Sequence, residues 1–362
     1  MSSNFRHWVL HDYLQVNGGA ERLVITLARG LNGFGLGVSG IYPDFSGTGS
    51  VDGLHCEVTS LKGFRLPRIA RALLAFSYGT KFIAHADRVI YSGFYAPLAA
   101  KRQVGGRRIY YCHTPPRFAF DRQDEYVNRA AWPLRFFLRL AIDYYRRAYL
   151  DSLRYMDVIV VNSNHVRERV LALTRLESQV VYPPIATDKF KYISDSGYYL
   201  SVARLEHAKR VDRIVEAFLQ MPERNLVVAS GGSQIKALKA LAHGAANIRF
   251  TDWIDDDDLS DLMGRATAVI YIPADEDFGM SAVEAMSAGK PVIGVAAGGL
   301  TETIIDGETG VLLDPDASPN DIATAVRHLS SDVALRMRAA CERRAEKFSN
   351  ERFLASFESL LS

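Results

Sequence analysis

Two series of alternating strand and helix patterns, separated by a proline pair, constrain the fold of this 362-residue chain more than any other feature. Apolar, β-rich runs occupy residues 7–14, 88–93, 107–114 and 157–163 before the prolines, and residues 198–204, 225–230, 247–251, 268–273 and 291–296 after them. Amphipathic segments with helical spacing, such as residues 20–31, lie between the runs. Nearly continuous apolar runs are typical of parallel strands buried on both faces. The pattern therefore predicts an α/β fold with two Rossmann-like domains.

The boundary between the two domains is expected at Pro183 and Pro184, because proline interrupts helices and central strands. A polar run follows this pair and has the composition of a linker. We expect an N-terminal domain over residues 1–185, a C-terminal domain over residues 186–345 and a terminal helix over residues 346–362. The terminal segment carries phenylalanines at helical spacing.

Candidate functional residues follow several of the predicted strands, where ligands bind in open parallel sheets. Gly18 and Gly19 separate the first run from the first amphipathic segment, so the backbone there can approach an anion closely. A tight strand-to-helix turn explains the same pair. His113 ends the run at 107–114 and precedes two prolines. A lone histidine is commonly structural. Because His113 lies at the carboxyl end of a strand, a functional role and a structural role are equally expected here.

Charged residues follow two strands of the second series. Arg204 and Lys209 are five residues apart across one loop, and two converging cations suit a diphosphate. The alternative is a solvated basic loop. The acidic run at residues 255–258 resembles a metal site, but it precedes a helical pattern and is expected to be a helix N-terminus.

The stretch from Ala274 to Gly294 contains two carboxylates, Glu276 and Glu284, eight residues apart. Ser281-x-x-Glu284 has the form of a helix capping box, which would give Glu284 a purely structural role. The loop also contains Gly279 just before the expected helix. Glu276, this glycine and the helix start together predict a concave polar site, whose carboxylates suit the vicinal hydroxyls of a sugar or ribose.

The residues from Glu276 to Glu302 resemble the hallmark of the family-4 retaining glycosyltransferases, which have the GT-B fold and a pair of carboxylates at this spacing. Further segments resemble motifs of the same family: ARLEHAKR (203–210) its diphosphate clamp, NGGAER (17–22) its first glycine-rich loop, VNSNHVRERV (161–170) the motif ending its N-terminal domain, and YYCHTPPRFAFD (110–121) the branch that includes O-antigen mannosyltransferases. The resemblance covers nearly the whole chain. One departure is Arg210, where the family often has glycine after the clamp lysine, and it puts the shape of that loop and the role of Lys209 in doubt.

The resemblance implies the GT-B architecture, with two facing Rossmann-like domains and a C-terminal helix that returns to the N-terminal domain. It implies four catalytic residues: His113 near the reacting carbon, Glu276 on the donor sugar, and Arg204 and Lys209 on the diphosphate. The two cations would stabilise the leaving group electrostatically. The implied donor-binding residues are Gly18, Gly19, Phe278, Gly279, Met280, Ser281 and Glu284, the last on the ribose hydroxyls.

The implied activity is the retaining transfer of a sugar from a nucleotide-sugar to a glycan acceptor. The segment around His113 favours GDP-mannose as the donor. The expected acceptor is a polyprenyl-diphosphate-linked oligosaccharide of bacterial surface polysaccharide synthesis, because the chain is expected to attach to an anionic membrane, as described below. We expect neither a metal nor a cofactor, because the cationic pair takes the place of a metal. The alternatives are a UDP- or dTDP-sugar transferase, an epimerase or phosphorylase with the same fold, and a non-catalytic sugar-nucleotide-binding scaffold.

Charge is divided unevenly along the chain. Residues 1–187 contain 24 Lys and Arg against 14 Asp and Glu, a formal charge of +10, and residues 188–362 have a formal charge of −8. Residues 129–150 interleave aromatic residues with arginines, as interfacial helices do. We expect peripheral binding to an anionic cytoplasmic membrane surface; the alternative is a packed helix with solvated arginines. Neither a nucleic-acid-binding motif, a signal peptide nor a spanning apolar run is found, so nucleic acid is not an expected partner and the expected location is the cytoplasm.

Overall fold

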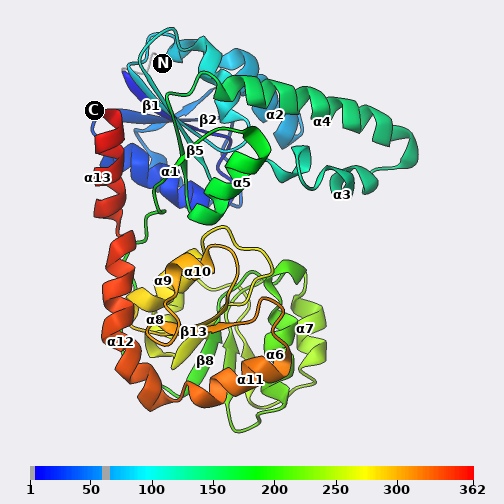
Figure 1. Cartoon of the computed structure of the whole chain (residues 1–362), viewed down its shortest axis with the longest axis vertical. Helices are drawn as coiled ribbons and strands as arrows, with labels where there is room; N and C mark the ends of the chain where they lie inside the picture. The colour runs from blue at the N-terminus through cyan, green and yellow to red at the C-terminus, as the bar shows by residue number, and fades with distance from the viewer. Residues whose placement is uncertain (1–4, 59–65) are drawn as a thin grey trace. The chain divides into compact units, whose positions relative to one another are not determined.

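The computed structural model describes residues 5–58 and 66–362, which form two compact units (Figure 1). The first unit runs to Tyr182 and also includes Phe353–Ser362, and the second unit is Pro183–Arg352. The chain therefore leaves the first unit at the proline pair and returns to it within the last helix.

The first unit contains a parallel sheet of seven strands in the order β3-β2-β1-β4-β5-β6-β7. Its strands are β1 (His7–His11), β2 (Phe34–Val38), β3 (His55–Glu57), β4 (Arg88–Ser92), β5 (Arg107–Cys112), β6 (Val158–Val161) and β7 (Gln179–Val180). Strand order reverses between β1 and β4, where His11 lies opposite Ser92. Such a switch point is where open α/β sheets bind ligands.

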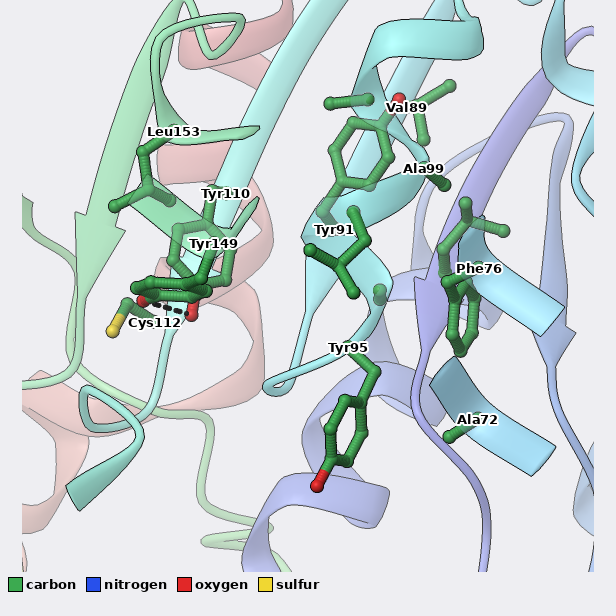
Figure 2. Packing of buried hydrophobic residues seen from close by; sticks show 14 of the residues in the cluster. Ala72, Phe76, Val89, Tyr91, Tyr95, Ala99, Tyr110, Cys112, Tyr149 and Leu153 are labelled. Atoms are coloured by element: carbon green, nitrogen blue, oxygen red, sulfur yellow. Dashed lines mark hydrogen bonds between the residues drawn. The ribbon is translucent and has the colours of Figure 1, made fainter. Parts of the chain in front are cut away.

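Helices cover both faces of this sheet. They are α1 (Gly19–Gly30), α2 (Arg68–Leu74), α3 (Gln123–Asn128), α4 (Trp132–Leu153), α5 (Asn164–Thr174) and α13 (Asn350–Leu361), with the shorter turns η1 (Thr48–Val51), η2 (Ala75–Gly79), η3 (Lys81–Ile83), η4 (Ala96–Arg102) and η5 (Arg117–Ala119). One apolar core lies between the sheet and α2, η2, η4 and α4. Figure 2 shows part of this core, in which the hydroxyls of Tyr110 and Tyr149 are hydrogen bonded at 3.0 Å.

The other face of the sheet is covered by α1 and α13. Phe353 and Phe357 of α13 pack on Tyr111 of β5, with ring centroids 6.2 and 5.9 Å apart. Arg107 Nε donates a hydrogen bond to the Leu360 carbonyl at 3.2 Å. The prediction that the C-terminal helix returns to the N-terminal domain is confirmed.

The second unit contains a parallel sheet of six strands in the order β10-β9-β8-β11-β12-β13. Its strands are β8 (Tyr198–Ser201), β9 (Asn225–Val228), β10 (Ile248–Phe250), β11 (Ala268–Ile270), β12 (Val292–Val295) and β13 (Gly310–Leu313). Its helices are α6 (Val211–Leu219), α7 (Ile235–Leu241), α8 (Asp256–Arg265), α9 (Met280–Ser287), α10 (Leu300–Thr303), α11 (Pro319–His328) and α12 (Ser331–Ala345), with the turns η6 (His207–Lys209) and η7 (Glu346–Phe348). The switch point of this sheet lies between β8 and β11.

The acidic run at residues 255–258 begins α8. Asp255 is the N-cap, and its carboxylate accepts hydrogen bonds from the amides of Asp257 and Asp258 at 3.1 and 2.8 Å. Its expected role as a helix N-terminus is confirmed.

Candidate functional site

The loop between β11 and α9 carries Glu276, and two glycine positions fix its path. Gly279 has a φ of 90°, and an added Cβ would lie 2.5 Å from Cδ2 of Leu300. Any L-residue there would be strained and would also clash. Gly298 has a φ of 57°, and an added Cβ would lie 2.3 Å from the Glu276 carbonyl oxygen. This close approach lets the amide of Gly299 donate to that carbonyl at 2.8 Å, which holds the Glu276 backbone.

Glu276 forms a compact cluster with Lys209 and Tyr271. Lys209 Nζ lies 2.7 Å from Glu276 Oε2 and 3.0 Å from the Tyr271 hydroxyl, which itself lies 2.5 Å from the same carboxylate oxygen. Burial, aided by the charge of Glu276, raises the pKa of Tyr271 well above its ordinary value. The tyrosine therefore stays protonated and donates to the carboxylate.

Tyr271 was missed by the sequence analysis. It directly follows β11, and the hydroxyl of a buried tyrosine usually needs a hydrogen-bond partner. A tyrosine at the end of an otherwise aliphatic run, next to a polar loop, was the available signal.

The β8–α6 loop carries Arg204 and Lys209 but places them differently. Lys209 lies in η6, and the amide of Ala274 donates to the Ala208 carbonyl at 2.8 Å, which joins this loop to that of Glu276. The Arg204 side chain is 51% exposed, and its partner among the described residues is Glu206 Oε1 at 3.6 Å. The structure thus brings Lys209 and Glu276 together and leaves Arg204 outside their cluster.

Arg210, the departure from the family pattern, adopts the conformation that glycine favours. Its φ is 53°, in the left-handed region. Its guanidinium donates to the Pro315 carbonyl and lies 3.3 Å from Asp316 Oδ1. The loop therefore makes its left-handed turn without glycine.

Glu284 lies within α9 and is only 4% exposed. The capping-box alternative is wrong, because Gly279 is the N-cap and Ser281 is already the second residue of the helix. Met280 and Ser281 lie in the first turn, where helix amides are available to a ligand. The ring of Phe278 packs on Phe348 with centroids 5.4 Å apart, so its side chain belongs to the apolar packing of the second unit.

A second group of polar side chains lies at the switch point of the first unit. Ser92 Oγ is 3.1 Å from His11 Nδ1 and 2.8 Å from His113 Nε2. Burial lowers the pKa of His11 to about 4 and that of His113 to about 3, the latter also through the neighbouring His11. The sequence analysis singled out His113 and missed its two partners, which are the last residues of β1 and β4.

Asp12 follows β1 and anchors the loop after β4. Its carboxylate accepts hydrogen bonds from the amides of Phe94, Tyr95 and Ala96 at 2.6, 2.7 and 2.8 Å. Burial raises the pKa of Asp12 to about 6, and the three amides oppose that shift. This aspartate was also missed, and its signal was a charged residue at the end of a buried strand.

Gly18 and Gly19 begin α1, as expected for the glycine-rich loop. Gly18 is the N-cap with a φ of −82°, so the conformation itself does not require glycine. An added Cβ at Gly18 would lie 2.7 Å from Glu21 Oε2, so the missing side chain mainly leaves space at the helix start.

Two family models match the chain. The model of group 1 glycosyl transferases matches residues 185–348, and that of glycosyltransferase family 4 matches residues 17–189. The chain is 26% identical over 392 residues to the Alpha-1,3/1,6-mannosyltransferase ALG2 of Dictyostelium discoideum, covering 90% of this chain and 89% of that protein. It is 26% identical over 405 residues to the ALG2 of Homo sapiens, covering 95% and 92%.

Solved structures share the fold over the full length. The lipopolysaccharide outer core galactosyltransferase WaaB aligns with a TM-score of 0.71 and 16% identity over 98% of each chain. Anabaena HepE in complex with UDP and glucose aligns with a TM-score of 0.72 and 16% identity over 99% of each chain. Together with the two family models, this likeness identifies the chain as a member of the group 1, family 4 glycosyltransferases: a retaining, nucleotide-sugar-dependent glycosyltransferase with the GT-B fold.

Proposed function

We propose that this glycosyltransferase transfers mannose from GDP-mannose to a lipid-linked glycan, without a metal. The observation that carries the proposal is the cluster of Lys209, Tyr271 and Glu276 at the switch point of the second unit. A carboxylate held by one cation and one hydroxyl still has lone pairs for sugar hydroxyls. Mannose is favoured by the relatives named as mannosyltransferases.

The second unit supplies the donor-binding groups in this proposal. Glu276 accepts hydrogen bonds from the sugar, and the buried carboxylate of Glu284 accepts them from the ribose. Arg204 and Lys209 bind the diphosphate. When the bond from the sugar to the phosphate breaks, its electron pair leaves on the diphosphate, and the two cations stabilise that charge. The oxygen of an acceptor hydroxyl forms a bond to the same carbon, and the hydroxyl proton passes to the leaving diphosphate, which completes the transfer.

The exposed state of Arg204 fits this role. A long side chain that is half exposed and paired only weakly with Glu206 can turn to a diphosphate at little cost. Lys209, in contrast, is already held against Glu276. Arg204 would thus contact the diphosphate only after the donor has bound, whereas Lys209 already lies beside Glu276 in the free protein. His113, Gly18 and Gly19 remain candidates for contacts with the donor from the first unit.

The acceptor is proposed to be lipid-linked because α4 exposes large apolar side chains. Trp132, Phe136 and Phe137 are 81%, 65% and 68% exposed, whereas Tyr145 and Tyr149 further along the helix are buried. In Figure 1 the first half of α4, together with α3, extends away from the sheet of the first unit. The packed-helix alternative therefore holds for the second half only. Among the described residues, no helix has the length and apolarity needed to cross a bilayer.

A thermal-shift panel of nucleotide-sugars tests the donor. GDP-mannose is expected to raise the melting temperature more than UDP-glucose, UDP-galactose or dTDP-glucose at equal concentration, because a ligand that binds only the folded state stabilises it. Glu276→Gln should abolish most of the shift, and Glu216→Gln on the exposed side of α6 is the matched control. If a UDP-sugar gives the larger shift, that UDP-sugar and not GDP-mannose is the donor.

A further inference from the structure

An apolar cavity of about 330 Å³ lies within the first unit, between α4, η4 and α2 with its continuation η2. Its volume is in the range of pockets that bind small molecules, about 300–1,000 Å³. Leucines and alanines of these elements line it, together with four tyrosines: Tyr78, Tyr144, Tyr145 and Tyr155. No step of the proposed transfer uses this cavity.

The helices around the cavity bury one face in the core and direct another face to the cavity. On α2 and η2, Ala72 and Phe76 are fully buried in the core (Figure 2). Leu74 and Tyr78, each two residues further on, line the cavity and are 41% and 67% exposed. The turn η2 is π-helical, a rare geometry that is frequent at functional sites. The cavity is therefore an open apolar space beside the core, at a turn of unusual geometry.

Several polar groups that line the cavity are already hydrogen bonded within the protein. The hydroxyls of Tyr145 and Ser152 each donate to a backbone carbonyl at 2.7 Å. The Ser77 carbonyl accepts two hydrogen bonds from Arg102. A ligand in the cavity would thus meet apolar surface and few free donors or acceptors. Because burying an unpaired polar group is unfavourable, such a lining suits a hydrocarbon chain better than a sugar or a nucleotide.

The charge around the cavity suits an anionic head group. Lys101 lines the cavity and is exposed, and within the part of the chain that the structure describes it has no hydrogen-bond or ion-pair partner. Arg102 lies over the Tyr78 ring, 5.9 Å from its centroid. Asp151 also lines the cavity, and Arg154 lies 4.0 Å from its carboxylate. The four charged side chains together have a positive formal charge.

One side of α4 leads from its exposed apolar end to the cavity. Phe137, Ala141, Tyr144 and Ala148 follow one another at helical spacing, so they lie on the same side of the helix. The first is 68% exposed, and the other three line the cavity. A lipid chain that leaves a membrane at Phe137 would therefore reach the cavity along this side of α4.

The cavity is also connected to the switch point of the first sheet. η4 begins at Ala96, whose amide donates to Asp12, and Lys101 lies five residues further along η4. At about 2.0 Å per residue, these five residues span about 10 Å. Tyr145, which lines the cavity, donates to the carbonyl of Phe94 in the same loop. The diphosphate and the first sugars of a lipid-linked glycan can bridge this distance.

We propose that this cavity binds the isoprenyl chain of the lipid-linked acceptor, with Lys101 beside its diphosphate. The inference rests on the proposed function for the identity of the acceptor. The chemistry of the site, an apolar chain with an anionic head group, follows from the lining of the cavity. The four tyrosines favour an isoprenyl chain over a saturated acyl chain, because its planar double-bond units can lie flat on aromatic rings.

Isothermal titration with farnesyl diphosphate tests the cavity without vesicles. The titrated protein carries Arg204→Ala and Lys209→Ala, so that the cations proposed to bind the donor do not contribute. Ala148→Phe fills the cavity and should weaken binding about tenfold or more, because excluding two methylene groups from an apolar site already costs about that factor. Ala141→Phe, at an exposed position of the same lining, should have the same effect.

Ala355→Phe is the matched control for both cavity-filling variants, since Ala355 is exposed on α13 of the same unit. It should leave the affinity for farnesyl diphosphate unchanged. The proposal is overturned if farnesyl diphosphate does not bind, or if it binds the cavity-filling variants and the control equally well.

Two further titrations test the head group and the chain. Lys101→Gln should weaken farnesyl diphosphate about two- to fivefold, as loss of an exposed ion pair does, and leave farnesol unchanged. Lys81→Gln, on the exposed turn η3, is the control. Dodecyl diphosphate should bind more weakly than farnesyl diphosphate. Equal binding of the two would mean that the cavity takes a membrane acyl chain, and an unchanged affinity in Lys101→Gln would refute the placement of the diphosphate.

These titrations and the thermal-shift panel fail independently. If farnesyl diphosphate binds as expected and no nucleotide-sugar stabilises the protein, the proposed function fails and the cavity keeps its ligand. If GDP-mannose stabilises the protein and Ala148→Phe leaves farnesyl diphosphate binding intact, the cavity assignment fails and the proposed donor stands.

Discussion

At the scale of single residues, Glu276 shows how two partners hold a loop carboxylate in place. Lys209 supplies a positive charge at 2.7 Å, and Tyr271 supplies a hydroxyl at 2.5 Å. The tyrosine thereby directs one of the two carboxylate oxygens. The other oxygen remains available to a ligand.

We expect Tyr271→Phe to lower kcat/KM about tenfold, because a hydrogen bond to a charged group contributes on the order of 1.5 kcal/mol. The melting temperature should change little, because the ion pair with Lys209 remains. Tyr198→Phe is the matched control, since its hydroxyl donates to the Leu262 carbonyl at 2.7 Å in the same unit. Steady-state kinetics that show equal activity for both variants would contradict the role of Tyr271.

Arg210 provides a test of backbone strain. Its left-handed conformation costs a side-chain-bearing residue about 1 kcal/mol relative to glycine. Arg210→Ala loses the hydrogen bonds to Pro315 and Asp316 and keeps the strain, whereas Arg210→Gly loses the same bonds and relieves it. We therefore expect the glycine variant to be the more stable of the two by about 1 kcal/mol in urea denaturation. Equal stabilities would show that the loop relaxes in both.

The buried histidines should make stability depend on pH. His11 has a pKa of about 4 in the folded chain against 6.5 in the unfolded chain, so only the unfolded chain is protonated between these values. Protonation of His11 in the unfolded chain therefore lowers the free energy of unfolding as the pH falls from about 6.5 to 4. Asp12, with its pKa raised to about 6, acts in the opposite direction over nearly the same range.

His11→Asn removes one of these opposing contributions. Between pH 7 and pH 5, its free energy of unfolding should fall less than that of the wild type, because the residue that the unfolded chain protonates is gone. Urea denaturation at several pH values measures the difference. Identical pH slopes for the two proteins would mean that His11 has the same pKa in the folded and the unfolded chain.

At the scale of elements, all nine apolar runs of the sequence contain strands of the structure, because buried parallel strands need continuous apolar segments. The sequence analysis did not predict β2, β3, β7 and β13. The run GVLL of β13 is apolar and was overlooked, whereas the other three strands lack this signal. β2 has the sequence FGLGV, in which two glycines interrupt the apolar run. Larger residues do not fit there, because a Cβ added to Gly35 would lie 2.6 Å from Phe5 and one added to Gly37 would lie 2.7 Å from Leu10. β7 has only two residues.

The site residues divide in the same way into those that a local sequence pattern indicates and those that depend on contacts between distant segments. Glu276, Lys209 and His113 were found because each lies at the end of an apolar run. Ser92 was missed because its partners His11 and His113 come from β1 and from the end of β5, the neighbouring strands. Tyr271 was missed although Glu276 is only five residues away, and its second partner, Lys209, comes from the loop after β8. Strand order is decided by the packing of the whole sheet, and no local pattern encodes it.

Helix α13 should contribute strongly to the stability of the first unit. Phe357 is fully buried against Tyr111, so Phe357→Ala should cost about 3–5 kcal/mol through lost burial and the resulting cavity. Leu335→Ala on α12 is the control, since Leu335 is 56% exposed and its loss should cost under about 0.5 kcal/mol. Urea denaturation that shows similar midpoints for both variants would mean that α13 is only loosely attached.

At the scale of the whole molecule, the charge asymmetry acts together with the exposed part of α4. The first 187 residues have a formal charge of +10. However, Arg139 pairs with Asp124 at 2.9 Å and Arg146 with Asp143 at 2.8 Å, which reduces the positive charge along the helix. The apolar side chains near its start must therefore supply much of any attraction to a membrane.

We predict reversible binding to anionic vesicles with two separable contributions. Each basic residue near an anionic surface contributes on the order of 1 kcal/mol, and this attraction decays within a Debye length of about 10 Å at 0.1 M salt. Burial of a Phe side chain adds about 1.5–3 kcal/mol, which salt does not screen. Sedimentation with vesicles should therefore show binding that rises with anionic lipid and falls, but not to zero, with salt.

The combined substitution of Trp132, Phe136 and Phe137 by serine should remove the salt-resistant part of this binding. All three side chains are exposed, so the fold should tolerate the change and the thermal shift with nucleotide-sugar should be kept. Trp253→Ser is the matched control, because Trp253 is 68% exposed but belongs to the second unit. If the wild type does not sediment with fully anionic vesicles at low salt, α4 does not bind membranes and its exposed side chains no longer support a lipid-linked acceptor.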